Sequence, residues 1–234
     1  PHVLDKNKFD PVDDQLAARM HKAIAIMQFK LEGQLIKEHP EFDLDKRLLL
    51  DKIDFENGTV NVEGTVYPLN DTFFPTIDPN NPYELTEDER AVMNSLSASI
   101  INSERLQTHI RYMFSHGALY KRINGNLLFH GCIPMDENGD FLPVDIYGAK
   151  CAGRALMDHL DKQIRASYFS PEKIKKYGKP GDLMWYLWLA KDSPLFGKEK
   201  MTTFERLFID DKASHKEHVR PYYKLINSKE PCEK

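Results

Sequence analysis

Apolar side chains recur at helical spacing along residues 14–36, on one face of the helix that this spacing predicts. These apolar positions are Leu16, Met20, Ala23, Ile24, Met27 and Leu31. Asp13 and Asp14 precede the stripe, and aspartate is a favoured N-terminal cap. The pair His39-Pro40 ends the pattern, because a residue before proline avoids the helical conformation. We therefore predict a long amphipathic helix that packs one face against a core.

A second long helix is predicted over residues 87–116. Thr86 and Glu89 have the spacing of a capping box, in which each side chain bonds the other residue's backbone amide. The apolar positions behind this box are Val92, Leu96, Ile100, Leu106, Ile110, Met113 and Phe114. Gly117 is a favourable stop. Shorter helical patterns cover residues 154–168 and begin again near Met201, with Thr202 or Thr203 as the cap.

Alternating apolar and polar positions predict small antiparallel sheets between the helices. Residues 53–69 alternate around the turns Asn57-Gly58 and Glu63-Gly64, which indicates a three-stranded meander. The pair Asn124-Gly125 favours a hairpin turn between residues 118–123 and 126–133, and the latter run has the length of a buried strand. Residues 144–151 form another predicted strand region with a turn at Tyr147-Gly148. The fold class that follows is α+β, with long helices packed on antiparallel hairpins.

His130 is the candidate functional residue that this pattern isolates. It stands where the apolar strand over residues 126–133 meets a loop, and strand ends commonly hold ligands or metals in sheet-based enzymes. Gly131 would let the backbone come close to a bound group. A hydrogen-bonded core histidine fits the same pattern. The residues of this segment leave both interpretations open.

Composition places the chain among ordinary globular proteins. Its 234 residues are 41% apolar and 29% charged, with a formal net charge of -4 that argues against nucleic acid as a partner. No apolar run approaches the roughly 18 residues of a membrane-spanning helix. Three cysteines without paired spacing fit a reducing compartment and ordinary thiols, so we expect a cytoplasmic protein. Because the chain begins at Pro1, we expect a piece of a longer protein or a processed one.

Several runs of residues resemble known phosphatases. The strand leading to His130 ends in Phe129-His130-Gly131-Cys132-Ile133-Pro134, which resembles the His-Gly-Gly segment of calcineurin-like metallophosphoesterases, where the histidine is a metal ligand. Asp182-Leu183-Met184-Trp185, followed by Ser193-Pro194, is similar to the Asp-Leu-Leu-Trp-Ser-Asp-Pro stretch of phosphoprotein phosphatases. Four longer runs, residues 29–34, 47–51, 124–134 and 194–206, resemble class III, or Firmicutes-type, fructose-1,6-bisphosphatases.

That resemblance implies hydrolysis of fructose 1,6-bisphosphate to fructose 6-phosphate in gluconeogenesis, with Mn²⁺ or a similar divalent metal as the cofactor. It identifies residues 1–116 as an insert-like helical region with a small meander. Residues 117–234 would then be part of the catalytic region and include part of a metallophosphoesterase β-sandwich. The family's Asp-x-His, Gly-Asp-x-x-Asp-Arg-Gly and Gly-Asn-His motifs and its final Gly-His motif are absent, so only His130 carries over as a metal ligand. We expect the chain alone to be inactive and to hold no metal stably.

The substrate's second phosphate requires cationic side chains away from the metals. The candidates are Lys198, Lys200, Arg206 and Arg154, each of which also fits ordinary solvated surface. The resemblance further implies nucleotide and phosphoenolpyruvate effectors, which no residue places. A rival interpretation is a non-catalytic assembly or regulatory module, in which the helices over 14–36 and 87–116 supply an apolar face for a homo-oligomer.

Overall fold

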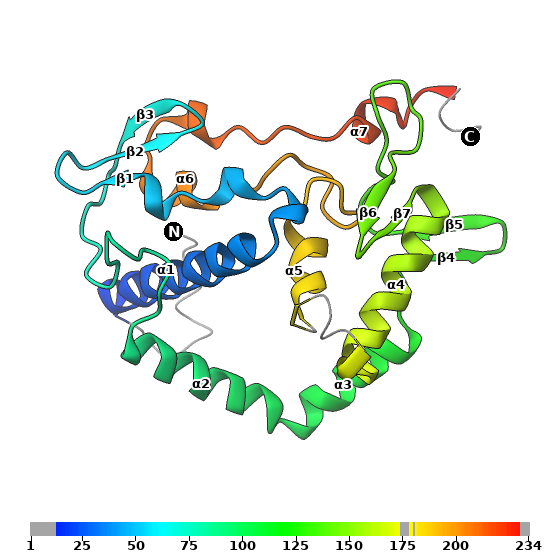
Figure 1. The fold of residues 1–234 in the computed structure, drawn as a ribbon, viewed down its shortest axis with the longest axis horizontal. Helices are drawn as coiled ribbons and strands as arrows, with labels where there is room; N and C mark the ends of the chain where they lie inside the picture. The colour runs from blue at the N-terminus through cyan, green and yellow to red at the C-terminus, as the bar shows by residue number, and fades with distance from the viewer. Residues whose placement is uncertain (1–12, 174–177, 180, 230–234) are drawn as a thin grey trace.

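The computed structural model describes residues 13–173, 178–179 and 181–229. Long helices and three separate antiparallel sheets alternate along the chain (Figure 1). This arrangement confirms the α+β class. None of the described helices is both long enough and apolar enough to cross a membrane.

The first helix, α1 (Asp14–Glu38), spans the molecule's two main cores. Asp13 caps it, because its carboxylate accepts a hydrogen bond from the Gln15 amide at 2.8 Å, and the helix ends at His39 as predicted. Its second half is buried, whereas Leu16, Met20 and Ile24 near its start are 51%, 62% and 44% exposed. The predicted apolar face is therefore covered only along the second half of the helix.

The first core lies between α1, a β-meander and α6 (Thr203–Phe208). The meander joins β1 (Ile53–Asp54), β2 (Thr59–Val62) and β3 (Thr65–Pro68) in that order, as the alternation predicted. Val60 and Val62 point into this core, where the rings of Phe29, Phe204 and Phe208 meet. This packing places α6 against the first half of the chain.

The second core joins the end of α1 to later parts of the chain. It contains α4 (Gly153–Phe169), α5 (Asp182–Leu189) and the hairpin of β6 (Val144–Ile146) and β7 (Ala149–Cys151). Leu35 and Ile36 of α1 pack here with Leu156, Leu160 and Leu187, all at least 90% buried. The end of α1 and the later helices α4 and α5 thus share a hydrophobic core.

The predicted helix over residues 87–116 is two helices, which corrects the sequence-based prediction. The first, α2 (Glu87–Ile101), begins with the predicted capping box at Thr86 and Glu89. It ends at Asn102, and Ser103 caps α3 (Glu104–His116) because its hydroxyl accepts the Leu106 amide hydrogen bond at 3.4 Å. Serine and asparagine compete for backbone hydrogen bonds and favour helix ends. The apolar pattern alone passes over this break.

The hairpin that leads to His130 is formed by β4 (Tyr120–Ile123) and β5 (Asn126–Phe129). Asn124 and Gly125 have φ angles of 51° and 79°, as the predicted type I′ turn requires. The prediction of a buried strand was wrong, because Leu127 and Leu128 are 50% and 53% exposed. No further strand pairs with this two-stranded sheet among the described residues. The last short helix, α7 (Tyr222–Leu225), packs beside it through Phe129 and Tyr222.

Candidate functional site around His130

The structure places the His130 side chain in an exposed position immediately after β5. Within the described part of the chain its imidazole has no hydrogen bond or ion pair. The alternative of a hydrogen-bonded core histidine is therefore wrong for the described residues. A free imidazole at a strand end is available to bind a ligand.

The backbone after His130 is fixed by close contacts with a distant loop. A Cβ atom at Gly131 would lie 2.5 Å from the Pro194 carbonyl oxygen, so only glycine fits there without a shift. The Cys132 amide donates to that same carbonyl oxygen at 2.9 Å. The Tyr223 hydroxyl donates to the Gly131 carbonyl oxygen at 3.3 Å. These contacts set the direction in which the His130 side chain leaves the backbone.

The loop over residues 192–197 is itself held from two sides. Ser193 is fully buried, and its hydroxyl donates to the Leu187 carbonyl at 2.6 Å and accepts from the Leu195 amide at 3.1 Å. Arg220 pairs with Asp192 at 2.8 Å and with Glu199. Burial raises the pKa of Asp192 despite the nearby Arg220 charge. The loop therefore ties His130 to both α5 and the C-terminal segment.

The buried Cys132 side chain packs against this loop. Burial raises the pKa of its thiol to about 11, and the sulfur lies 3.6 Å from the Ser193 carbonyl oxygen, to which the thiol donates. Cys151 is free too. The prediction of ordinary thiols is confirmed for these two, whereas Cys232 lies outside the described residues.

The four predicted phosphate-binding cations do not form one group, although two of them meet at one carboxylate. Lys198 pairs with Glu217 at 2.6 Å, and Arg206 contacts the same carboxylate at 3.7 Å. Lys200 is nearly buried between Glu63 and Glu205, with both pairs at 2.9 Å. Arg154, on α4, donates to the Tyr120 hydroxyl at 3.0 Å and pairs with Asp158. The substrate-binding role of these four residues stays a prediction.

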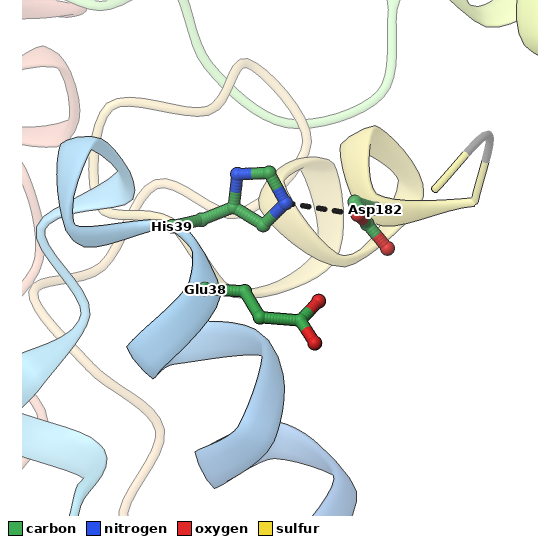
Figure 2. A group of neighbouring side chains, drawn as sticks. All are labelled: Glu38, His39 and Asp182. Carbon is green, nitrogen blue, oxygen red and sulfur yellow. Dashed lines mark hydrogen bonds and ion pairs between the residues drawn. The ribbon is translucent and has the colours of Figure 1, made fainter. Parts of the chain in front are cut away.

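A cluster that the sequence patterns did not indicate joins α1 to α5 (Figure 2). Possible ligand atoms of Glu38, His39 and Asp182 lie within 4.8 Å of one another. The two ring nitrogens of His39 lie 2.8 Å from a Glu41 oxygen and 2.8 Å from an Asp182 oxygen. Glu38 pairs instead with Lys179 at 3.1 Å. Such a group has the composition of a metal site.

The hydrogen bonds favour a structural role for this cluster. Both His39 nitrogens already bond carboxylates, so the ring has no nitrogen left for a metal ion. The ring also stacks on Phe42, with centroids 4.6 Å apart. Burial alone would lower the pKa of His39, but its bonds to Glu41 and Asp182 and their charges outweigh burial and raise it. We interpret His39 as an imidazolium that clamps the end of α1 to the start of α5.

The clamp predicts that stability falls as pH rises. Because the folded-state pKa of His39 lies above its ordinary value of 6.5, the stabilisation is complete below about pH 6.5 and is lost as pH rises through the folded pKa. Thermal unfolding between pH 6 and 9 should show this loss, and His39→Gln should lack that part of the pH dependence. An identical pH profile in the variant would contradict the clamp.

The chain is similar to known proteins along its whole length. A family model described as Firmicute fructose-1,6-bisphosphatase matches residues 1–234. Proteins named "Fructose-1,6-bisphosphatase class 3" are similar: 53% identical over 234 residues in Clostridium tetani, and 50% over 232 residues in Clostridium acetobutylicum. Both alignments cover 99% of this chain and 35% of the relative, so the chain spans about a third of these curated relatives' length. No solved structure matches this chain.

Proposed function

The chain belongs to the Firmicute fructose-1,6-bisphosphatase family. We propose on this basis that it is part of an enzyme that hydrolyses fructose 1,6-bisphosphate to fructose 6-phosphate and phosphate. The observation that carries the proposal is the identity of 50–53% with class 3 enzymes along 99% of the chain. Since those relatives are about three times longer, the proposed activity is that of a protein of their length that contains this chain. We propose that the reaction belongs to gluconeogenesis and takes place in the cytoplasm.

His130 is proposed as one ligand of a divalent metal centre, with Mn²⁺ or a similar divalent ion, which the family resemblance implies, as the metal. The free imidazole and the fixed backbone at Gly131 support this role. Among the described residues, however, His130 belongs to no group of three or more His, Cys, Asp or Glu side chains with metal-binding geometry. Two metals about 3.5–4 Å apart supply an activated water and a clamp for the phosphoryl group in many phosphatases. We propose that the other ligands come from the rest of the longer protein.

The hairpin of β4 and β5 supports the proposal that residues 117–234 contribute to a larger catalytic sheet. A two-stranded sheet is marginally stable alone, and the exposed Leu127 and Leu128 offer apolar surface to a neighbour. The free strand edges can accept further strands. We propose that a metallophosphoesterase sandwich is completed there by the rest of the longer protein. Residues 1–116 would be an insert whose helix α1 is anchored in the core that also contains α4 and α5.

A second proposed role is assembly into a homo-oligomer. Val92, Leu96 and Ile100 follow one another at four-residue spacing on α2 and are 47%, 44% and 49% exposed. An exposed apolar stripe of this kind typically marks an interaction surface. Sedimentation of the longer protein tests this role, and a monomer at micromolar concentration would exclude it. The nucleotide and phosphoenolpyruvate effectors remain predictions.

Lys198 is the proposed cation for the second phosphate of the substrate. Its neighbour Gly197 packs against Cys132, because a Cβ atom at Gly197 would lie 3.2 Å from the Cys132 sulfur. This contact connects the backbone beside Lys198 to the His130 segment. Its side chain is 41% exposed and can leave Glu217 for a phosphate.

We predict that Lys198→Ala raises the KM for fructose 1,6-bisphosphate about tenfold, a loss of roughly 1.4 kcal/mol in binding. Steady-state kinetics of the longer protein measures this change. Lys150→Ala is the matched control, because Lys150 is an exposed lysine of β7 without a partner among the described residues. An unchanged KM would remove Lys198 from the substrate site.

The experiment for the proposed function is phosphate release from fructose 1,6-bisphosphate by the longer protein with Mn²⁺. We expect release of one phosphate per substrate molecule, with fructose 6-phosphate left intact. Equal rates with unrelated phosphate monoesters would contradict a sugar bisphosphatase. Hydrolysis of neither would exclude the proposed activity.

A further inference from the structure

A cleft of about 390 Å³ lies between the β2–β3 hairpin and residues 213–218, the first three of which belong to a short 3₁₀ helix (Lys212–His215). The side chains that matter for its chemistry are Lys46, Glu63, Tyr67, Lys200, Lys216 and His218. Figure 1 shows the β2–β3 hairpin and β5 at opposite ends of the molecule's longest axis. The cleft is therefore separate from the His130 segment, which follows β5.

Positive side chains line this cleft from both sides, and one carboxylate occupies the space between two of them. Glu63 accepts from Lys46 at 3.0 Å through one oxygen and from Lys200 at 2.9 Å through the other. Lys200 is anchored from behind by the buried Glu205 at 2.9 Å. The second carboxylate of the cleft, Glu199, is already paired with Arg220.

Two further basic side chains face the cleft without an ion pair. Lys216 and His218 are exposed, and within the described residues their side chains have no partner. They are two residues apart in an extended segment, so both point to the same side. The His218 carbonyl accepts the Glu199 amide at 2.8 Å, which fixes this segment beside the cleft.

Glu63 is held over the cleft by the turn in which it lies. It has a φ angle of 50°, and Gly64 has 91°, as in a type I′ hairpin turn. Asn61 closes the turn by accepting the Gly64 amide at 2.9 Å. The hydrogen bond from Lys200 lowers the pKa of Glu63, which is therefore ionised at neutral pH. Its carboxylate lies between the ammonium groups of Lys46 and Lys200.

We propose that this cleft binds a phosphoryl dianion, either as inorganic phosphate or on a small phosphate monoester, held by Lys46, Lys200 and Lys216. A dianion attracts three ammonium groups more strongly than the single carboxylate it replaces. The Lys46–Glu63 pair is 60% and 43% exposed, and exposed pairs contribute little. Lys200 also loses its contact with Glu63 when that side chain swings out, but it keeps the buried Glu205 and gains the dianion. The volume exceeds what phosphate alone needs and lies in the range of small-molecule sites.

This inference does not depend on the proposed phosphatase activity. It gives Lys200 a role that is an alternative to the predicted binding of the substrate's second phosphate. The two proposals can fail separately. The cleft could bind phosphate in a protein without phosphatase activity, and an active phosphatase could bind no phosphate in the cleft.

Isothermal titration of the 234-residue chain with glycerol 3-phosphate and with inorganic phosphate tests the cleft. We expect one saturable site, at least tenfold weaker in Lys216→Ala and several-fold tighter in Glu63→Gln, where the competing charge is removed. Lys150→Ala should bind as the unaltered chain does. Tighter glycerol 3-phosphate binding would identify a monoester as the ligand, and equal affinity would identify free phosphate.

Both variants change exposed side chains, so their thermal unfolding should match that of the unaltered chain. The proposal is overturned if neither the unaltered chain nor Glu63→Gln shows saturable binding. It is equally overturned if Lys216→Ala binds with unchanged affinity.

Discussion

Replacing Gly131 with alanine is expected to lower the phosphatase activity of the longer protein about a hundredfold, because displacement of a catalytic group by about 1 Å has effects of this order. The added Cβ atom would lie 2.5 Å from the Pro194 carbonyl oxygen and 3.0 Å from the Leu195 carbonyl carbon. Both are backbone atoms of a loop held by Ser193 and Arg220, so the His130 segment must move instead. That movement displaces the proposed metal ligand.

Gly181→Ala is the matched control for this prediction. A Cβ atom at Gly181 meets no atom within 4 Å, and its φ angle of -85° suits alanine. Steady-state kinetics of the two variants, with thermal unfolding as a check on folding, separates a local displacement from general damage. Activity of Gly131→Ala within twofold of the unaltered protein would contradict the proposed positioning of His130.

Replacing Lys30 with methionine is expected to destabilise the chain by about 3–5 kcal/mol, the usual cost of removing one partner of a buried ion pair. Lys30 on α1 is fully buried, and its ammonium group lies 2.7 Å from Glu89. Glu89 also accepts the Thr86 amide at 2.9 Å, so this pair connects α1 to the capping box of α2. Without Lys30, the Glu89 carboxylate stays buried and uncompensated.

Denaturant unfolding measures this effect, and two further variants define its cause. Lys46→Met breaks a pair whose side chains are 60% and 43% exposed, so it should cost at most about 1 kcal/mol. Adding Glu89→Gln to Lys30→Met should recover most of the lost stability, because the amide oxygen still accepts the Thr86 hydrogen bond. Destabilisation of Lys30→Met by less than about 1 kcal/mol would show that the buried pair contributes little.

Local chemistry explains the parts of the fold that could be predicted. Asp13, the Thr86–Glu89 capping box and the turn Asn124-Gly125 each depend on residues within four positions, and the structure confirms all three. The break between α2 and α3 was missed because apolar residues continue on both sides of it. The polar pair Asn102-Ser103 is the feature that could have indicated it.

Other features depend on contacts between residues far apart in the sequence, which the spacing of apolar residues does not show. His39 and Asp182 are 143 positions apart, and the pattern around His39 indicated only a helix end. The apolar run before His130 matched a buried strand, yet Leu127 and Leu128 are exposed in this chain. Sequence alternation shows that a strand has an apolar side but does not show which part of a protein covers it. The resemblance to phosphatases, in contrast, singled out His130 and the Ser193-Pro194 stretch separately. The structure joins the two through the Gly131 and Cys132 contacts, which the sequence did not indicate.

The central claim is that this chain supplies one ligand, His130, to a metal centre that other parts of a longer protein complete. Isothermal titration with Mn²⁺ tests it most directly, applied in parallel to the 234-residue chain and to a protein of the relatives' length. We predict two tightly bound equivalents in the longer protein, weaker binding in its His130→Ala variant, and no tight binding by the chain alone. Tight binding of two equivalents by the chain alone would contradict the claim.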